Sequence, residues 1–165
     1  MNPLWPHQQT AIAELTGLME AGYREPVCLT GPCGSGKSRT MAELIKWASE
    51  RNWASVLYTN RKLLTEQISG VLYDHEISHG IRAAEYLPTP FRSVQVSSIP
   101  TETSRVHRSG KWQLHNAKLV LVDEAHSQGG PTAERIIRDH LAAGAFVLGF
   151  TATPVDLGHI YKRLV

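Results

Sequence analysis

One short stretch of the sequence constrains the fold more than any other. Residues 31–38 read Gly-Pro-Cys-Gly-Ser-Gly-Lys-Ser and fit the pattern G-x-x-x-x-G-K-[ST] at every fixed position. An apolar run at 27–29 precedes the stretch, and a helical pattern of apolar residues at 41–48 follows it. The glycines let backbone N–H groups turn inward, and the N-terminus of the following helix adds positive potential. The sequence therefore predicts a phosphate-binding loop, rather than a glycine-rich turn with a lysine by chance.

This loop assigns roles to individual side chains. Lys37 is expected to reach the β- and γ-phosphates of a nucleotide, and the Ser38 hydroxyl is expected to ligate Mg²⁺. The residues expected to contact the nucleotide in or beside the loop are Gly31, Pro32, Cys33, Gly34, Ser35, Gly36, Lys37, Ser38 and Arg39.

Length and composition limit the classes of protein to which the chain can belong. A chain of 165 residues predicts a single domain, 1–165. The formal net charge of +2 is too small to indicate a nucleic-acid partner, so such a partner has to be inferred from motifs. Because the N-terminus lacks a basic and apolar leader and no apolar run approaches bilayer length, we expect a cytoplasmic protein without a membrane partner. Cys28 and Cys33 lack metal-ligand spacing and are expected to be free thiols.

Apolar patterns divide the chain into alternating strands and helices, and this alternation predicts an α/β fold with a mainly parallel sheet and helices on both faces. The expected strands are 27–29, 55–58, 77–82, 94–98, 118–122 and, as the last one, 145–150. The expected helices are an amphipathic one that ends near residue 22, then 41–48, 63–72 and 132–143, with at least one helical turn after residue 100.

Acidic residues follow the buried strand directly. Asp123-Glu124-Ala125-His126 leaves the 118–122 run at the carboxyl edge of the sheet, where open α/β folds bind ligands. In enzymes with this phosphate loop, a carboxylate at such a position holds Mg²⁺ with the loop hydroxyl, which pairs Asp123 with Ser38. Glu124 is then the candidate that orients and deprotonates an attacking water. The alternative is an acidic pair that only caps the end of the strand.

A third motif follows the last expected strand, and the order of the three resembles a known family. Residues 31–38, 123–126 and 151–154 are similar to motifs I, II and III of the first RecA-like domain of a DEAH-type superfamily 2 DNA helicase or translocase. The resemblance covers nearly the whole chain and implies a RecA-like P-loop NTPase fold that uses ATP and Mg²⁺. It also implies a partner, the second RecA-like domain, which we expect to lie outside this chain. The catalytic residues that it implies are Lys37, Asp123, Glu124 and His126.

Weaker matches imply further contacts. Residues 4–8 resemble the adenine-recognition segment and assign Gln8 to the adenine edge, with an exposed glutamine at a helix start as the alternative. Residues 58–67 resemble motif Ia, which makes Asn60 and Arg61 contacts to a nucleic-acid phosphate. Residues 94–101 resemble a later strand-contact segment.

That later segment makes Thr101 a phosphate contact, and Arg105, Arg108 and Lys111 add charge nearby or form an ordinary solvated basic face. In the family, the segment with Thr151 and Thr153 connects the nucleotide and nucleic-acid sites, and these hydroxyls are expected to form a hydrogen-bond relay. The Thr-Ala-Thr form resembles DNA translocases, so DNA is expected rather than RNA.

Other readings remain open at this point. The first is a stand-alone P-loop NTPase or small-molecule kinase, the second an RNA-directed helicase domain, and the third a nucleic-acid adapter that does not hydrolyse ATP. The segment His75-Glu76-Ile77-Ser78-His79 fits the zinc-protease pattern H-E-x-x-H, but Gly80 follows at once and the segment is expected to enter a strand. The remaining histidines, His7 among them, are expected to be surface or packing residues.

Overall fold

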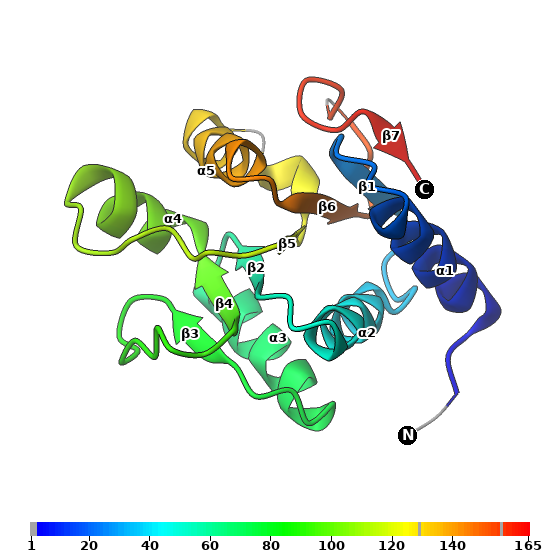
Figure 1. Ribbon diagram of the computed structural model, residues 1–165, viewed down its shortest axis with the longest axis horizontal. Helices are drawn as coiled ribbons and strands as arrows, with labels where there is room; N and C mark the ends of the chain where they lie inside the picture. Colours follow the sequence, from blue (N-terminus) through cyan, green and yellow to red (C-terminus); the bar gives the residue numbers. More distant parts are fainter. Residues whose placement is uncertain (1–2, 129, 156) are drawn as a thin grey trace.

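The computed structural model describes residues 3–128, 130–155 and 157–165. Its centre is one parallel sheet of seven strands in the order β3-β4-β2-β5-β6-β1-β7 (Figure 1). The α/β prediction with a parallel sheet is confirmed. The strands are β1 Val27–Thr30, β2 Ser55–Thr59, β3 Gly80–Arg82, β4 Val94–Ser98, β5 Leu119–Val122, β6 Phe146–Thr151 and β7 Arg163–Leu164.

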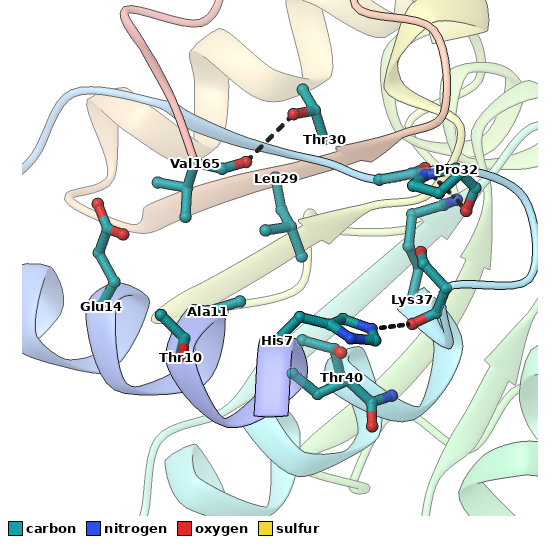
Figure 2. Close-up of a pocket in the computed structure, with 13 residues that line it drawn as sticks. His7, Thr10, Ala11, Glu14, Leu29, Thr30, Pro32, Lys37, Thr40 and Val165 are labelled. Atoms are coloured by element: carbon teal, nitrogen blue, oxygen red, sulfur yellow. Dashed lines mark hydrogen bonds between the residues drawn. The ribbon is translucent and has the colours of Figure 1, made fainter. Parts of the chain in front are cut away.

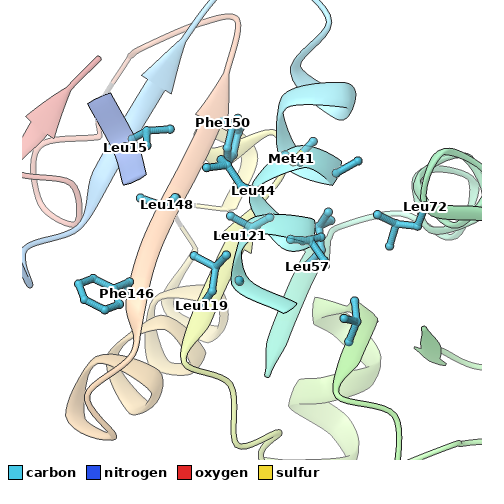
Figure 3. Close-up of a cluster of buried hydrophobic side chains, with 14 of the residues drawn as sticks. Leu15, Met41, Leu44, Leu57, Leu72, Leu119, Leu121, Phe146, Leu148 and Phe150 are labelled. Atoms are coloured by element: carbon cyan, nitrogen blue, oxygen red, sulfur yellow. The ribbon is translucent and has the colours of Figure 1, made fainter. Parts of the chain in front are cut away.

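Helices cover both faces of this sheet, as expected. The helices α1, α2 and α3 supply residues to one buried apolar cluster (Figure 3), and α5 packs into a second cluster with the short α4. No helix in the described part of the chain is long and apolar enough to cross a membrane. The helices are α1 Pro6–Glu20, α2 Lys37–Glu50, α3 Lys62–Asp74, α4 Ile99–Glu102, a π-helical turn η1 Thr103–Arg108, a 3₁₀ turn η2 Ala125–Gln128 and α5 Pro131–Ala142.

The apolar run of β5 explains why the sheet has a core on each side. Leu119 and Leu121 join the cluster under α2, whereas Val120 and Val122 join the cluster under α5. Successive strand residues point to opposite faces, so a strand between two helical layers needs apolar residues at every position. All residues of β5 are fully buried, and this fixes the strand that carries the acidic motif.

The expected strand at 77–82 is wrong in its first half. The helix α3 closes with hydrogen bonds from Glu76 N to Tyr73 O and from Ile77 N to Leu72 O, and Glu76 adopts a φ of 58°. This is the left-handed helix end in which the backbone of residue 77 satisfies a helix carbonyl. The strand can therefore begin only at Gly80.

The strand expected at 145–150 is present as β6, but it is not the last strand, as was expected. The short strand β7 adds to the free edge of β1, where Lys162 N donates to Pro26 O and Val165 N donates to Cys28 O. Its two residues are exposed and show no apolar alternation. Only pairing with a strand far away in the sequence creates β7, so local patterns do not reveal it.

Replacing Gly149 by alanine is expected to destabilise the fold by about 1–3 kcal/mol, because it overpacks a closed contact. Gly149 lies on β6 under the ring of Tyr161, and an added Cβ would lie 2.5 Å from the Cζ atom of that ring. Tyr161 is only 4% exposed, so its ring has little room to move. Urea unfolding measures the effect.

The matched control is Tyr161→Phe. The Tyr161 hydroxyl is buried and has no hydrogen-bond partner among the described residues, so its removal is expected to leave stability unchanged or slightly higher. An unfolding midpoint that stays the same in Gly149→Ala would show that the ring does not pack on β6 as described.

Candidate functional site

Sheet order brings the three sequence motifs together. The phosphate loop follows β1, Thr151 ends β6, and Asp123 follows β5, and these strands are neighbours in the order β5-β6-β1. Since the strands are parallel, their carboxyl ends meet at one edge. A hydrogen bond of 3.0 Å from Gly31 N to Thr151 O joins two of the motifs directly.

The phosphate loop wraps around its own lysine. Lys37 is the first residue of α2, and its Nζ donates to Gly31 O at 2.9 Å and to Pro32 O at 3.1 Å. Gly36 precedes the helix with a φ of 78°, and a Cβ at this position would lie 2.3 Å from Gln8 Nε2. Glycine is required at residue 36 both for its backbone angle and for the close approach of Gln8.

Gln8 joins the first helix to this loop. Its side chain is 3% exposed, its Oε1 accepts from Trp5 N at 2.9 Å, and its Nε2 donates to Gly36 O at 3.1 Å. The alternative of an exposed glutamine at a helix start is therefore wrong. Sequence matching placed Gln8 beside the loop, and the structure brings the two together.

A pocket of about 570 Å³ opens between α1, β1 and the phosphate loop (Figure 2). Its wall combines apolar groups, Leu29 and Ala11 among them, with loop residues and the polar ends of Gln8 and Thr40. Pockets of this size with a few polar groups suit a small organic ligand. The remaining lining residues are His7, Thr10, Glu14, Thr30, Gly31, Pro32, Ser35, Lys37 and Val165.

His7 is exposed, in agreement with the expected surface position, and it also lines this pocket. Its Nε2 lies 3.0 Å from Ser35 O, so the ring contacts the phosphate loop. The position of His7 one residue before Gln8, inside the segment that resembles a base-recognition motif, was the signal that could have identified it.

A second pocket, of about 390 Å³, lies on the acidic side of the loop. Ser38, Asp123 and Glu124 all line it, so the two expected Mg²⁺ ligands share one space. Hydroxyl and carboxylate oxygens are suitable ligands for Mg²⁺. The helix α3 also lines this pocket, through Leu64, Gln67, Ile68 and Val71, and no role in the nucleotide site was expected for these residues.

The two carboxylates differ in environment. Asp123 is 8% exposed, and burial, followed by the charge of Glu124, raises the pKa of Asp123 to about 6. The charges of Lys37 and His126 act against this shift and lower the pKa of Asp123. Glu124 has a φ of 50°, and its N–H donates to Asp123 Oδ1 at 3.0 Å. A bound cation stabilises the charged form of a buried carboxylate that lies beside a second carboxylate. This pair of side chains therefore suits a divalent ion.

Polar contacts of His126 connect the acidic motif with the end of β6. His126 Nδ1 lies 3.3 Å from Glu124 Oε2 and 2.8 Å from Thr151 Oγ1. Thr151 Oγ1 also accepts from Thr153 N at 3.0 Å and donates to Thr153 O at 3.2 Å. The Thr151 hydroxyl thus contacts the acidic motif where the relay was expected, and the relay itself stays a prediction. Thr153 takes part through its backbone, whereas a hydroxyl was expected.

The expected nucleic-acid contacts also lie at the carboxyl edge, over strands β2 and β4. Asn60 and Arg61 follow β2, and Thr101 lies in α4 directly after β4. Arg61 is exposed, and Thr101 Oγ1 accepts from Ala84 N at 3.2 Å. Lys62 follows them as the first residue of α3, and its side chain lies outside the described part.

The H-E-x-x-H segment does not form the helix that a zinc protease needs. The helix α3 ends at Asp74, and His75 Nδ1 lies 2.9 Å from Val71 O. His79 uses both ring nitrogens locally, with Ser69 Oγ at 2.7 Å and Ile77 O at 2.8 Å. Within the described ranges, no group of three acidic, histidine or cysteine side chains could hold a metal ion.

Alkylation of the chain with N-ethylmaleimide is expected to modify Cys33 selectively and to obstruct nucleotide binding, whereas Cys33→Ala is tolerated. Both cysteines are free, but Cys33 is exposed in the phosphate loop, while Cys28 is fully buried and burial raises its pKa to about 12. Thiolate is the reactive form, so Cys28 stays inert. Mass spectrometry and nucleotide titration measure the two effects. Unchanged affinity after modification would contradict the loop geometry.

Comparisons with known proteins agree with this arrangement. A sequence profile described as "Type III restriction enzyme, res subunit" matches residues 2–156. A "51.5 kDa protein" of a Lactococcus phage (isolate 7-9) is 27% identical over 126 residues, which cover 76% of this chain and 24% of that protein.

Solved structures show the same fold. The Hef helicase domain of Pyrococcus furiosus superposes with a TM-score of 0.74 at 17% identity, over 96% of this chain and 36% of that one. The Sulfolobus solfataricus SWI2/SNF2 ATPase core in complex with dsDNA gives a TM-score of 0.73 at 14% identity, over 93% of this chain and 33% of that one. The chain thus spans a quarter to about a third of these relatives.

The RecA-like fold expected from the motifs is confirmed by these superpositions. Since the profile match extends over nearly the whole sequence, the chain belongs to the family described as type III restriction enzyme, res subunit.

Proposed function

We propose that this chain is the ATP-binding motor domain, the first RecA-like domain, of a DEAH-type superfamily 2 helicase or translocase that couples Mg²⁺-ATP hydrolysis to movement on DNA or to its unwinding. One observation carries the proposal. The phosphate loop, the acidic motif and Thr151 meet at one edge of the sheet, and a chain of two polar contacts runs from Glu124 through His126 Nδ1 to Thr151. A kinase or simple NTPase has no need for that chain.

The residues of the two pockets have different roles in nucleotide binding and hydrolysis. Lys37 and the loop amides hold phosphate, and Ser38 and Asp123 hold Mg²⁺, which supplies positive charge to the phosphates when bound. Glu124 accepts the proton of the attacking water. Gln8 recognises adenine in this proposal, because it lines the first pocket and its amide is hydrogen-bonded to the loop.

The nucleic-acid strand is proposed to cross the exposed start of α3 and the end of β4. Arg61, Asn60 and Thr101 contact backbone phosphates there, so binding is sequence-tolerant and weakens as salt increases. DNA is favoured over RNA by the Thr-Ala-Thr form of the third motif. The presence of dsDNA in one structure of the same fold agrees with this choice.

Hydrolysis and movement need a second RecA-like domain in this proposal. The relatives are much longer than the part that this chain matches. We therefore expect the chain alone to bind nucleotide weakly, to hydrolyse it very slowly and not to unwind duplex DNA. Unwinding by the chain alone at the rate of an intact helicase would disprove this point.

Anisotropy of a labelled single-stranded DNA, measured at increasing salt, tests the DNA assignment. Wild-type affinity is expected to fall with salt, and Arg61→Ala to reduce the slope of the log–log plot by about one. Arg135→Ala, which removes an exposed charge from α5, is the matched control. A slope that Arg61→Ala leaves unchanged would remove Arg61 from the nucleic-acid path, and tighter binding of RNA of the same sequence would favour an RNA-directed motor.

A further inference from the structure

A groove of about 640 Å³ lies away from the nucleotide edge. Three of its residues, Ala54, Ser93 and Asn116, come directly before or close before β2, β4 and β5 (Figure 1), so they lie at the amino ends of these strands. The nucleotide motifs lie at the opposite, carboxyl ends. Two segments form the walls of the groove, the β3–β4 connection from Pro88 to Ser93 and the segment from Lys111 to Asn116.

The charged side chains that line this groove are all positive. Its lining contains Arg82, Arg92 and Lys111, but no aspartate or glutamate. Arg82 is neutralised by Glu102, with Nη2 to Oε1 at 2.7 Å, whereas the only described hydrogen bond of the Arg92 guanidinium is to the Ser78 hydroxyl. Lys111 is exposed, and no described residue pairs with it. Two uncompensated cations therefore face the groove, which fits an anionic occupant.

The arginine at the base of the groove is part of a rigid layer. The Arg82 guanidinium lies 4.8 Å from the centre of the Trp112 ring and donates to Gln113 O at 2.7 Å. Arg105 lies over the same ring at 4.3 Å. These contacts fix the segment that carries Lys111, so the groove is present without a ligand.

An exposed aromatic side chain, Phe91, lines this groove. Phe91 is 77% exposed, and prolines at 88 and 90 restrict the backbone before it. A single exposed ring is ordinary by itself, so it is the charged side chains beside Phe91 that point to a ligand. The Arg92 guanidinium lies 5.4 Å from the centre of this ring, and Lys111 lines the same groove. An exposed ring beside cations suits single-stranded nucleic acid, since a base stacks on the ring while flanking phosphates meet the charges.

His115 adds no charge at neutral pH. Its Nε2 lies 3.0 Å from Ser93 O, and burial lowers its pKa. The positive charge of the groove therefore depends on arginine and lysine, which stay protonated over the working range of pH.

We propose that this groove is a second nucleic-acid contact, in which Arg92 and Lys111 hold backbone phosphates and Phe91 stacks with an unpaired base. The groove lies apart from the proposed path over Arg61 and Thr101. The inference rests on the proposed function in one respect, namely that the partner is a nucleic acid. Binding in the groove is independent of sequence, because no base edge is read.

A fluorescein-labelled oligothymidine of about 20 nucleotides, long enough for more than one contact surface, tests the proposal by anisotropy at low and moderate salt. Phe91→Ala is expected to weaken binding by about 5- to 150-fold. Lys111→Ala and Arg92→Ala are each expected to reduce the log–log salt slope by about one. The matched controls are Tyr73→Ala, whose ring is 79% exposed on α3, and Lys46→Ala, an exposed lysine on α2.

Photocrosslinking with an oligonucleotide that carries 5-iododeoxyuridine provides an independent readout, and a crosslink in the peptide with Phe91 is expected. If Arg61→Ala weakens binding while the groove variants match their controls, the groove proposal is wrong and the proposed function stands. If the groove variants alone weaken binding, the groove proposal holds and the path over Arg61 is wrong. Equal competition by polyglutamate would mean that the groove takes acidic peptide, and absent DNA binding would contradict both proposals.

Discussion

Replacing Glu102 by glutamine is expected to lower the free energy of unfolding by about 3–5 kcal/mol, because it leaves a buried guanidinium without its counter-charge. Glu102 is fully buried, and it accepts from Arg82 Nε at 3.0 Å and from Arg82 Nη2 at 2.7 Å. The Ser97 hydroxyl donates to the same carboxylate at 2.8 Å. Glutamine keeps the size of the side chain, so the loss reports charge and hydrogen bonding rather than a cavity.

Urea unfolding and thermal melting measure this change, and the midpoint is expected to fall by about 6–20 °C for a domain of this size. The double variant Arg82→Met/Glu102→Leu is the control, since replacing both charges by apolar groups is often close to neutral. If the double variant is as unstable as Glu102→Gln, the loss comes from packing, and the account of an uncompensated charge is wrong.

Glu124→Gln is expected to slow ATP hydrolysis by about 100- to 10,000-fold while nucleotide binding is retained. The amide has nearly the same shape as the carboxylate but cannot accept a proton from water. Glu124 lines the pocket that holds Ser38 and Asp123, so its side chain is placed beside the phosphates that Lys37 would hold. The backbone hydrogen bond from residue 124 to Asp123 Oδ1 does not depend on the side chain and is expected to remain.

A single-turnover assay with protein in excess over radiolabelled ATP detects the slow reaction of this chain, and DNA is added to both proteins. Arg135→Ala, at an exposed position of α5 that lines neither pocket, is the control for folding and is expected to keep the wild-type rate. Retention of more than about a tenth of the wild-type rate in Glu124→Gln would show that another group activates the water.

Strong local patterns made most of the fold and part of the site predictable. The strand β5 is a continuous apolar run, and the glycines of the loop have one well-defined use, so both were found from sequence. The acidic motif was placed correctly because it follows a strand that is buried on both faces.

Features that depend on distant contacts were not predictable. The strand β7 exists only through pairing with β1, and the role of His7 depends on Ser35, which lies 28 residues away in the sequence. The groove beside Phe91 is formed by two irregular segments, in which prolines and polar residues leave no periodic apolar pattern. Neither hydrophobic patterning nor a motif can reveal such a surface.

Titration of the chain with a fluorescent ATP analogue and Mg²⁺ tests the central claim most directly, with Lys37→Ala and Gln8→Ala as variants and GTP as competitor. Lys37→Ala is expected to weaken binding by about 10- to 150-fold, the value of a hydrogen bond to a charged group. Gln8→Ala is also expected to weaken binding, and ATP is expected to compete better than GTP. An affinity that does not depend on Lys37 would contradict the phosphate-binding loop and the motor-domain account built on it.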